Sequence, residues 1–311
     1  TAVKLGATDG TCRILASRSV SSTRHADFST FSLAVAGACG ALMEETGAKA
    51  SAIGLATPGY MDPRTGDLLD GGGNIPLLIN DNLAAALARL TATDVVTLND
   101  GVAAAMAEWR FGAGRGRRNF AMLTLGTGVG GAIIIDGRPV TGPAGEPPEL
   151  GAMVLDAKQQ PGTLESLAGA PAFVTEYRRA GGTTGIKDVA TLFERLTEDR
   201  AALLAVDVVA SRLAQAIGTL TNALALDGCV IGGGVSAAGA ALMQPLLRYL
   251  PRFTWPLLFG QLDVRTAELS NMAGAIGAAM TAAERHRGSA AEGRFNPMPT
   301  QRSRNEALFE K

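Results

Sequence analysis

Few side chains in this sequence could bind a metal ion or form a disulfide. Its 311 residues include three cysteines and two histidines. Cys12, Cys39 and Cys229 lie far apart and match no zinc or disulfide spacing, so we expect reduced thiols, as in cytoplasmic proteins. His25 and His286 lie outside every motif described below. These absences argue against a histidine-based triad and against a histidine-rich metal site.

An excess of charge of either sign is also missing. The formal net charge is −1, which gives no support to a broad nucleic-acid-binding surface. The most basic stretch, residues 110–118, is interpreted either as a solvated loop or as a patch that steers an anionic co-substrate. No signal peptide is visible, and no uninterrupted apolar run reaches the roughly 20 residues of a membrane span. We therefore expect a cytoplasmic protein that binds neither nucleic acid nor membranes.

Glycine and apolar residues, by contrast, are abundant. Hydrophobic residues make up 47% of the sequence, and many of its 39 glycines follow short apolar runs that are typical of buried strands. We predict strands at residues 51–56, 95–98, 120–125 and 229–231, and mainly helix between residues 164 and 226. A strand, a glycine turn and then a further strand or helix occur in both halves. This order predicts an α/β protein with two related lobes and a cleft between them.

The tripeptide Asn99-Asp100-Gly101 stands at the end of a predicted strand and at the start of a predicted helix. A carboxylate in this place faces the edge of the sheet where ligands bind, and the helix dipole favours its ionised form. Ionised Asp100 can accept the proton of a substrate hydroxyl that attacks a phosphoryl group. The alternative is that Asp100 only caps the helix.

Two glycine-rich segments follow other predicted strands. Residues 126–131, GTGVGG, either present backbone N–H groups to an anion, with the Thr127 hydroxyl as a further donor, or form a plain hairpin turn. They match neither a Walker A loop nor a Rossmann fingerprint, because they lack Gly-Lys-Ser/Thr and a strand follows. Residues 232–236, GGGVS, either let a flat ligand such as adenosine approach the backbone or form a tight turn. Asp136-Gly137, between two apolar runs, predicts a β-hairpin.

Taken together, these segments resemble the ROK family of bacterial sugar kinases and sugar-responsive repressors. The resemblance implies a two-lobed actin-like, ribonuclease H-like ATPase fold with a central interlobe cleft, and it implies a homodimer. We expect a small α/β lobe from residues 1–98 plus about 273–288, a large α/β lobe from residues 99–272, and a polar C-terminal tail from residues 289–311. The segments that carry the resemblance are residues 96–131, ELG at 149–151, GTLESLAG at 162–169, IGGGVS at 231–236 and AGAIGAAM at 273–280.

The resemblance also implies an ATP-dependent carbohydrate kinase, in which Mg²⁺ arrives with ATP, and it assigns roles position by position. Asp100 matches the catalytic base, and Asn74, Asn99, Glu149 and Glu165 match side chains that hold the sugar. The matching phosphate and nucleotide turns contain Gly6, Thr8, Gly126, Thr127, Gly128, Gly233 and Gly234.

The sequence departs from the family pattern in three places. Lys4 stands where the family usually has an aspartate near the metal and the phosphates, which either moves that role to Asp9 or weakens catalysis. Ala152 replaces a histidine of the zinc site that the family often carries, and residues 156–163 contain no cysteine, so we expect no zinc. Glu146-Pro147-Pro148 is an insertion. This insertion and the missing histidine together indicate a changed acceptor, such as an amino sugar or a C7-cyclitol. A plain hexose stays open as the alternative acceptor.

Two other functions also stay open. The first is a non-catalytic ROK-type sugar-binding or regulatory module, for which Lys4 is the main support. ROK repressors act through an N-terminal helix-turn-helix, and we expect none here because the chain begins directly in its first predicted strand, unless it is truncated. The second is an unrelated actin-like ATPase or assembly protein, in which the predicted sugar-binding Asn and Glu side chains would have no role.

Overall fold

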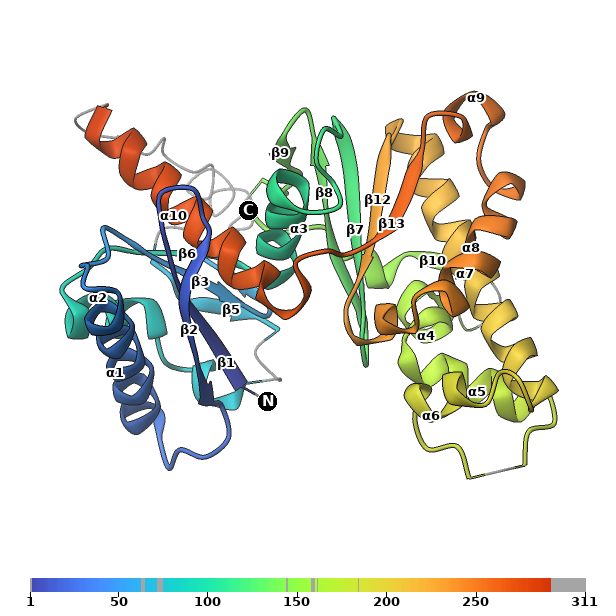
Figure 1. Ribbon diagram of the computed structural model, residues 1–311, viewed down its shortest axis with the longest axis horizontal. Helices are drawn as coiled ribbons and strands as arrows, with labels where there is room; N and C mark the ends of the chain where they lie inside the picture. Colours follow the sequence, from blue (N-terminus) through green and yellow to red (C-terminus); the bar gives the residue numbers. More distant parts are fainter. Residues whose placement is uncertain are drawn as a thin grey trace, which may run out of the picture.

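The helices and strands form two lobes that lie side by side (Figure 1). The chain passes between the lobes at α3 (Asp100–Phe111) and again just before α10 (Ala273–Ala291). The mixture of helices and strands in both lobes confirms the predicted α/β class. The computed structural model describes residues 2–62, 65–71, 75–143, 145–157, 160, 162–183 and 185–291.

The small lobe contains an antiparallel hairpin and a parallel pair of strands. β1 (Ala2–Thr8) pairs with β2 (Ile14–Ser21), and β3 (Ile53–Thr57) pairs in parallel with β6 (Val95–Asn99). The longest helix of this part, α1 (Phe28–Thr46), buries one apolar face against the strands. The remaining elements of the small lobe are β4 (Tyr60–Met61), β5 (Leu68–Asp70) and α2 (Leu83–Thr91).

A five-stranded sheet in the order β13-β12-β7-β8-β9 forms the centre of the large lobe. Its first three strands run parallel, and β8 and β9 are antiparallel additions at one edge. The strands are β7 (Asn119–Leu125), β8 (Val129–Ile135), β9 (Arg138–Pro139), β12 (Gly228–Gly232) and β13 (Asp263–Thr266).

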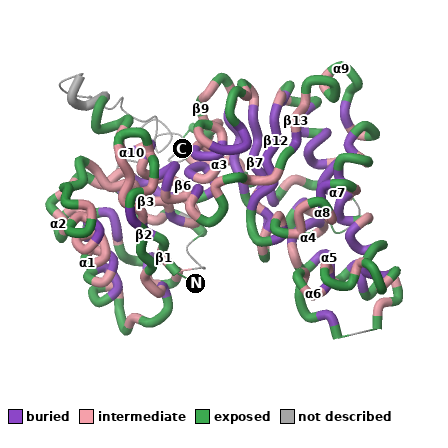
Figure 2. Tube along the Cα trace, in the orientation of Figure 1, coloured by how far each residue is buried: buried purple, intermediate pink, exposed green. Residues whose placement is uncertain are grey.

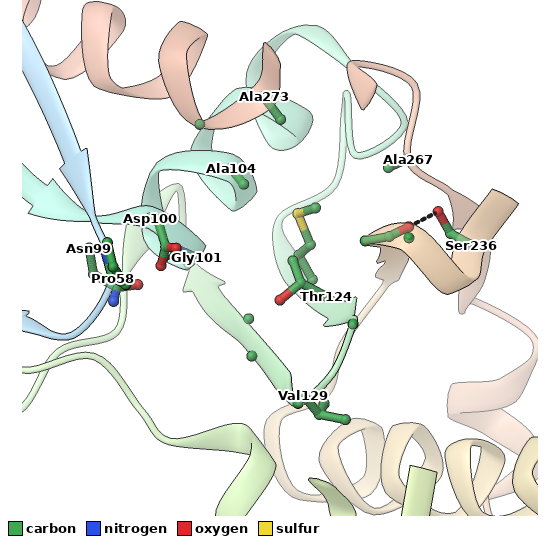
Figure 3. A pocket seen from close by; sticks show the side chains of 18 of the residues that line it. Pro58, Asn99, Asp100, Gly101, Ala104, Thr124, Val129, Ser236, Ala267 and Ala273 are labelled. Atoms are coloured by element: carbon green, nitrogen blue, oxygen red, sulfur yellow. Dashed lines mark hydrogen bonds between the residues drawn. The ribbon is translucent and has the colours of Figure 1, made fainter. Parts of the chain in front are cut away.

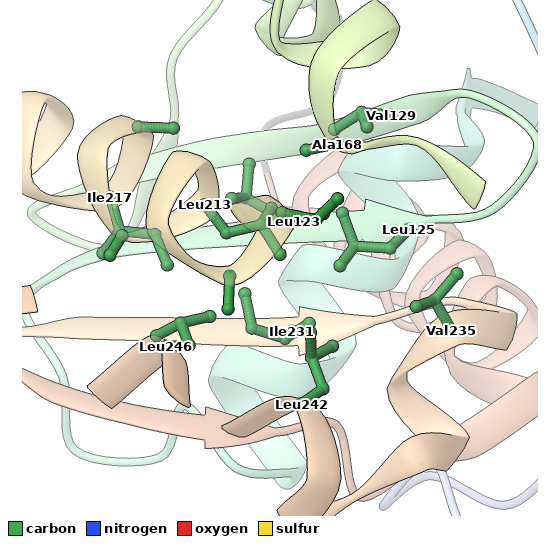
Figure 4. Close-up of a cluster of buried hydrophobic side chains, with 14 of the residues drawn as sticks. Leu123, Leu125, Val129, Ala168, Leu213, Ile217, Ile231, Val235, Leu242 and Leu246 are labelled. Carbon is green, nitrogen blue, oxygen red and sulfur yellow. The ribbon is translucent and has the colours of Figure 1, made fainter. Parts of the chain in front are cut away.

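Helices cover both faces of this sheet, so its three inner strands, β12, β7 and β8, are largely buried (Figure 2). On one face Leu213 and Ile217 of α7 (Arg200–Leu224) pack above Leu123 and Ile231 (Figure 4). On the other face α3 packs against β7 and β8. The predicted helical stretch 164–226 is confirmed. The other elements of this lobe are α4 (Leu164–Ala168), α5 (Ala170–Arg179), α6 (Val189–Glu194), α8 (Ala240–Tyr249), α9 (Pro256–Phe259), β10 (Val154–Asp156) and β11 (Gly162–Thr163).

By length and composition alone, α7 could cross a membrane. However, 56% of its most apolar window is buried inside the large lobe, which is the position of a core helix.

The two predicted turns between these strands differ in outcome. The hairpin at Asp136-Gly137 is confirmed, and both residues have positive φ (48° and 76°), as a type I′ turn requires. The predicted six-residue glycine turn is shorter than expected, because β8 already begins at Val129 and pairs with β7. Gly131 belongs to this strand: a Cβ there would lie 2.0 Å from the carbonyl oxygen of Met122. Glycine at this position therefore permits close strand contact rather than turning the chain.

Helix α10 connects the lobes through two contacts at which backbone meets backbone. A Cβ on Gly277 would lie 1.8 Å from the carbonyl oxygen of Ala103 in α3. A Cβ on Gly54 in β3 would lie 2.0 Å from the carbonyl oxygen of Ala278. Residues 289–291, predicted as the start of the polar tail, continue α10 instead, and the rest of that tail lies outside the described residues.

These contacts predict that Gly277→Ala destabilises the fold by about 1–3 kcal/mol, because an added methyl group overpacks the interface with α3. Gly37 in α1 is a matched control, since no atom lies within 4 Å of a Cβ built there. Gly37→Ala should leave the free energy of unfolding unchanged or raise it by up to about 1 kcal/mol, as alanine favours helix. Denaturant unfolding of both variants checks this, and equal stabilities would contradict the close contact.

Candidate functional site

The two lobes enclose a cavity of about 920 Å³. Its lining includes the start of α3, the turn after β7, the turn after β12 and the start of α10. In Figure 3, Asn99 and Asp100 lie on one side, Ser236 and Ala267 lie on the opposite side, and the side chain of Thr124 lies between them. The carboxyl ends of strands from both lobes therefore meet at one cavity, as the sequence predicted.

Asn99, and not Asp100, caps α3. The Asn99 side-chain oxygen accepts the N–H of Val102 at 3.1 Å, and its amide group donates to the carbonyl oxygen of Gly59 at 2.9 Å. Asp100 is the first residue of the helix, where its Oδ1 accepts the neighbouring N–H of Gly101 at 2.8 Å. The capping role that the sequence left open for Asp100 therefore belongs to Asn99.

The environment of Asp100 favours a proton on its carboxyl group. The side chain is exposed to the cavity, and the cavity walls displace part of the water around it. This loss of solvent raises the pKa of Asp100, and the backbone N–H groups of Gly101 and of Asp100 itself oppose the rise only in part. A carboxyl group with a raised pKa in a cleft is a recurrent property of acid–base sites.

Two glutamates stand together in the cavity wall. Glu149 and Glu165 both line it, and Oε2 of Glu165 accepts the N–H of Val129 at 3.1 Å. A Cβ on Gly128 would lie 2.3 Å from that oxygen, so the glycine leaves space for the carboxylate. The predicted acceptor-binding side chain is thus in direct contact with the predicted phosphate turn. The inserted prolines Pro147 and Pro148 form part of the same wall, beside Glu149.

Four of the predicted nucleotide-binding glycines line this cavity: Gly126, Gly128, Gly233 and Gly234. Gly233 has a φ of 81°, and a Cβ there would lie 2.3 Å from the carbonyl oxygen of Leu125, so the turn after β12 lies close to the end of β7. Thr127 is exposed and does not belong to the lining.

Sequence reasoning missed four polar residues in the lining: Thr124, Thr266, Ser270 and Asn271. Thr124 carried a usable signal, because it is the one polar residue in the predicted strand 120–125.

The other predicted nucleotide residues, Gly6 and Thr8, line a second cavity of about 770 Å³ in the small lobe. It adjoins the first, since Asp100 and Asn271 line both. Lys4 lines this second cavity and not the first, so it does not face the two glycine turns.

Asp9 makes hydrogen bonds within its own turn, and its role in metal binding stays a prediction. Its Oδ1 accepts three bonds within its own turn, from the N–H and hydroxyl of Thr11 at 2.8 and 2.6 Å and from the N–H of Arg13 at 3.1 Å. Its Oδ2 lies 3.3 Å from Nε of Arg13. The carboxylate therefore serves the β1–β2 turn.

Two further predictions concern Asn74 and the expected absence of zinc. Asn74 lies outside the described residues. Ala152 is exposed in a short 3-10 turn. Within the described ranges, no group of three or more His, Cys, Asp or Glu could hold a metal ion, and the absence of zinc stays a prediction.

The basic stretch 110–118 is largely neutralised by acidic partners. Arg117 pairs with Asp263 at 2.5 Å, Arg115 lies 3.5 Å from Glu268, and Arg118 pairs with Asp136. These ion pairs favour the solvated loop over a patch that steers anions.

Comparisons with known proteins cover both lobes. The sequence matches the model of the ROK family over residues 1–285. It is 32% identical over 259 residues to a glucokinase of Thermotoga maritima, a match that covers 77% of this chain and 81% of that protein. The fold is similar to a ROK hexokinase from Thermus thermophilus (28% identity, TM-score 0.75, 92% of this chain and 100% of that chain). It is also similar to a ROK family glucokinase from Streptomyces griseus in complex with glucose and AMPPNP (25% identity, TM-score 0.72, 90% and 95%).

The capping geometry predicts different stabilities for two neighbouring variants. Asn99→Ala should lower the free energy of unfolding by about 1 kcal/mol, because it removes the cap of α3. Asp100→Ala should cost less at neutral pH. Because the pKa of Asp100 is raised in the folded protein, ionisation of this side chain lowers the free energy of unfolding. This loss of stability is absent at a pH below the pKa of Asp100 in the unfolded chain and complete at a pH above its pKa in the folded protein. Alanine at this position removes the loss. Thermal unfolding of both variants checks this. A larger loss for Asp100→Ala would return the capping role to Asp100.

Proposed function

This chain belongs to the ROK family, and from that premise we propose that it transfers the γ-phosphoryl group of ATP to a hydroxyl of a sugar or sugar-like ring. It is an ATP-dependent carbohydrate kinase with the two-lobed actin-like fold. The glucokinase relative and the structure that holds glucose and AMPPNP support both the reaction and the two substrates.

One observation carries the mechanism: the carboxyl group of Asp100 faces the interlobe cavity while Asn99 makes the helix cap. Asp100 is the general base of the proposal. It takes the proton of the acceptor hydroxyl as that oxygen forms its bond to the γ-phosphorus, and the bond from the γ-phosphorus to the bridging β-phosphate oxygen breaks. ADP leaves with the electron pair of the broken bond.

The surrounding residues position the two substrates. Glu149 and Glu165 are acceptors for hydroxyl groups of the ring, at the end of the cavity next to Gly128. The turns at Gly126 and Gly233 present backbone to the phosphates and to the nucleoside. Mg²⁺ bound together with ATP would neutralise charge on the phosphates. Positioning of this kind supplies much of the acceleration in phosphoryl transfer.

The acceptor itself is the finer part of the proposal. Pro147 and Pro148 restrict the backbone of the wall beside Glu149. A rigid loop at this place favours an acceptor that differs from glucose at this end. We therefore include an amino sugar and a C7-cyclitol as acceptors, alongside a plain hexose.

Replacing the proposed base tests the mechanism. Asp100→Asn should lower kcat by roughly 10²–10⁴-fold, because the amide cannot accept the proton. In the wild type, kcat should fall as the pH drops through the pKa of Asp100, which lies above the ordinary aspartate value, since only the ionised form is a base. Steady-state phosphate transfer measured across pH checks both. Equal rates for the variant and the wild type would remove Asp100 from the mechanism.

An acceptor panel tests the substrate. We expect kcat/KM for an amino hexose or a cyclitol to exceed that for glucose. The double variant Pro147→Ala, Pro148→Ala should change the ratio between acceptors and leave the KM for ATP unchanged. A strong preference of the wild type for glucose would refute the altered-acceptor proposal. Sugar binding in calorimetry without phosphate transfer would instead favour the non-catalytic regulatory module.

A further inference from the structure

Glu108 is a buried acidic residue that the proposed reaction does not use. It lies on α3, about two turns after Asp100, and none of its surface is exposed. Its carboxylate accepts three backbone N–H groups: Oε2 accepts those of Ala113 at 2.9 Å and Glu268 at 3.2 Å, and Oε1 accepts that of Leu269 at 2.7 Å. Burial of a carboxylate lowers the stability of the folded protein unless hydrogen bonds of this kind satisfy its oxygens. Each of the three bonds is therefore important for the stability of the fold.

These bonds join α3 to the segment between β13 and α10, residues 267–272, which is called the crossover below. Glu268 and Leu269 form the middle of the crossover. Ala267 on one side of them and Asn271 on the other line the main cavity. Leu269 and Met272 also pack against an apolar cluster that α3 and α10 share. The carboxylate of Glu108 thus holds the part of the cavity wall that faces Asp100 across the cavity.

A second buried glutamate shows a different arrangement. Glu176 on α5 is 8% exposed and is paired with two arginines, Arg179 at 2.6 Å and Arg212 at 3.0 Å. No lysine or arginine pairs with Glu108 in the part of the chain that the structure describes. Flexible cations balance the charge of Glu176, whereas backbone N–H groups tie Glu108 to a fixed chain path.

Glycine next to Glu108 makes this geometry possible. A Cβ on Gly112 would lie 2.0 Å from Oε2 of Glu108, so the carboxylate occupies the space of a missing side chain. Gly112 has a φ of −110° and a ψ of −145°. Glycine at this position leaves the space that the carboxylate occupies.

We propose that Glu108 is a positioning residue, which holds the crossover at a fixed place relative to α3 and thereby aligns bound ATP with Asp100. The proposal rests on the kinase function above. It acts on the nucleotide side of the cavity, because the crossover lies beside the end of β12: a Cβ on Gly232 would be 3.5 Å from the Cβ of Ala267. The acceptor side, formed by Glu149 and Glu165, has no contact with these bonds.

Two variants weaken these bonds in different ways. Glu108→Gln keeps the size of the side chain but turns one acceptor oxygen into an NH₂ group that faces an N–H donor. Gly112→Ala leaves Glu108 in the chain and displaces its carboxylate. Each should raise the KM for ATP by about tenfold, the effect of losing one or two buried hydrogen bonds. The KM for the acceptor and the position of the acidic limb of the kcat–pH profile should stay unchanged, because Asp100 and the two glutamates are intact.

Glu176→Gln is the matched control, and hydrogen exchange is the readout that needs no activity. In the absence of substrates, amides of residues 266–274 should exchange faster in Glu108→Gln and Gly112→Ala than in the wild type. Glu176→Gln should lower the unfolding temperature, but it should change neither the KM for ATP nor the exchange of residues 266–274. If the wild type transfers no phosphate, the kinase proposal fails, and hydrogen exchange still tests the role of Glu108.

Three outcomes would overturn the positioning role. The first is an unchanged KM for ATP with unchanged exchange in Glu108→Gln. The second is an equal rise in KM for ATP and for the acceptor. The third is a raised KM for ATP together with faster exchange of residues 266–274 in Glu176→Gln. This result would mean that loss of any buried glutamate loosens the fold.

Discussion

The close packing of α10 on α3 and on β3 is the contact on which the rest of the molecule depends. At Gly277 and at Gly54 the backbones meet with no room for a side chain. Such contacts behave as rigid parts of a close-packed interior. Because α10 begins at the cavity and ends in the small lobe, this packing determines how the two lobes sit and where the cavity between them opens.

Helix α3 carries this arrangement to the site. At its first turn, Asn99 makes the cap and Asp100 is left to face the cavity. At its last turn, Glu108 holds the opposite wall through backbone N–H groups. Helix α3 therefore sets the position of the proposed general base relative to the nucleotide side of the cavity. This arrangement has a physical cost, because partial loss of solvent raises the pKa of Asp100 and disfavours the charge that a base needs.

The cavity combines two kinds of surface. Glycine turns after β7 and β12 bring backbone to one part of the lining, whereas carboxylates gather at another. The two meet at Gly128, where the carboxylate of Glu165 bonds to the strand that follows the turn. A sugar ring bound next to this carboxylate would thus lie beside phosphates bound at the turn. Direct transfer between two substrates requires such an arrangement.

The sequence by itself determined the α/β class and the Asp136-Gly137 hairpin, since these follow from apolar periodicity and from local turn chemistry. The family followed from the resemblance of its motifs, and the position of Asp100 between a strand and a helix placed it at a cavity. Tertiary structure alone decided that Asn99 is the cap, that Gly131 belongs to a strand, and that Asp9 serves its own turn. It also brought Glu108 to amides about 160 residues away. Local patterns report which residues form an element. They do not report which donor reaches which acceptor, because that depends on how distant elements pack.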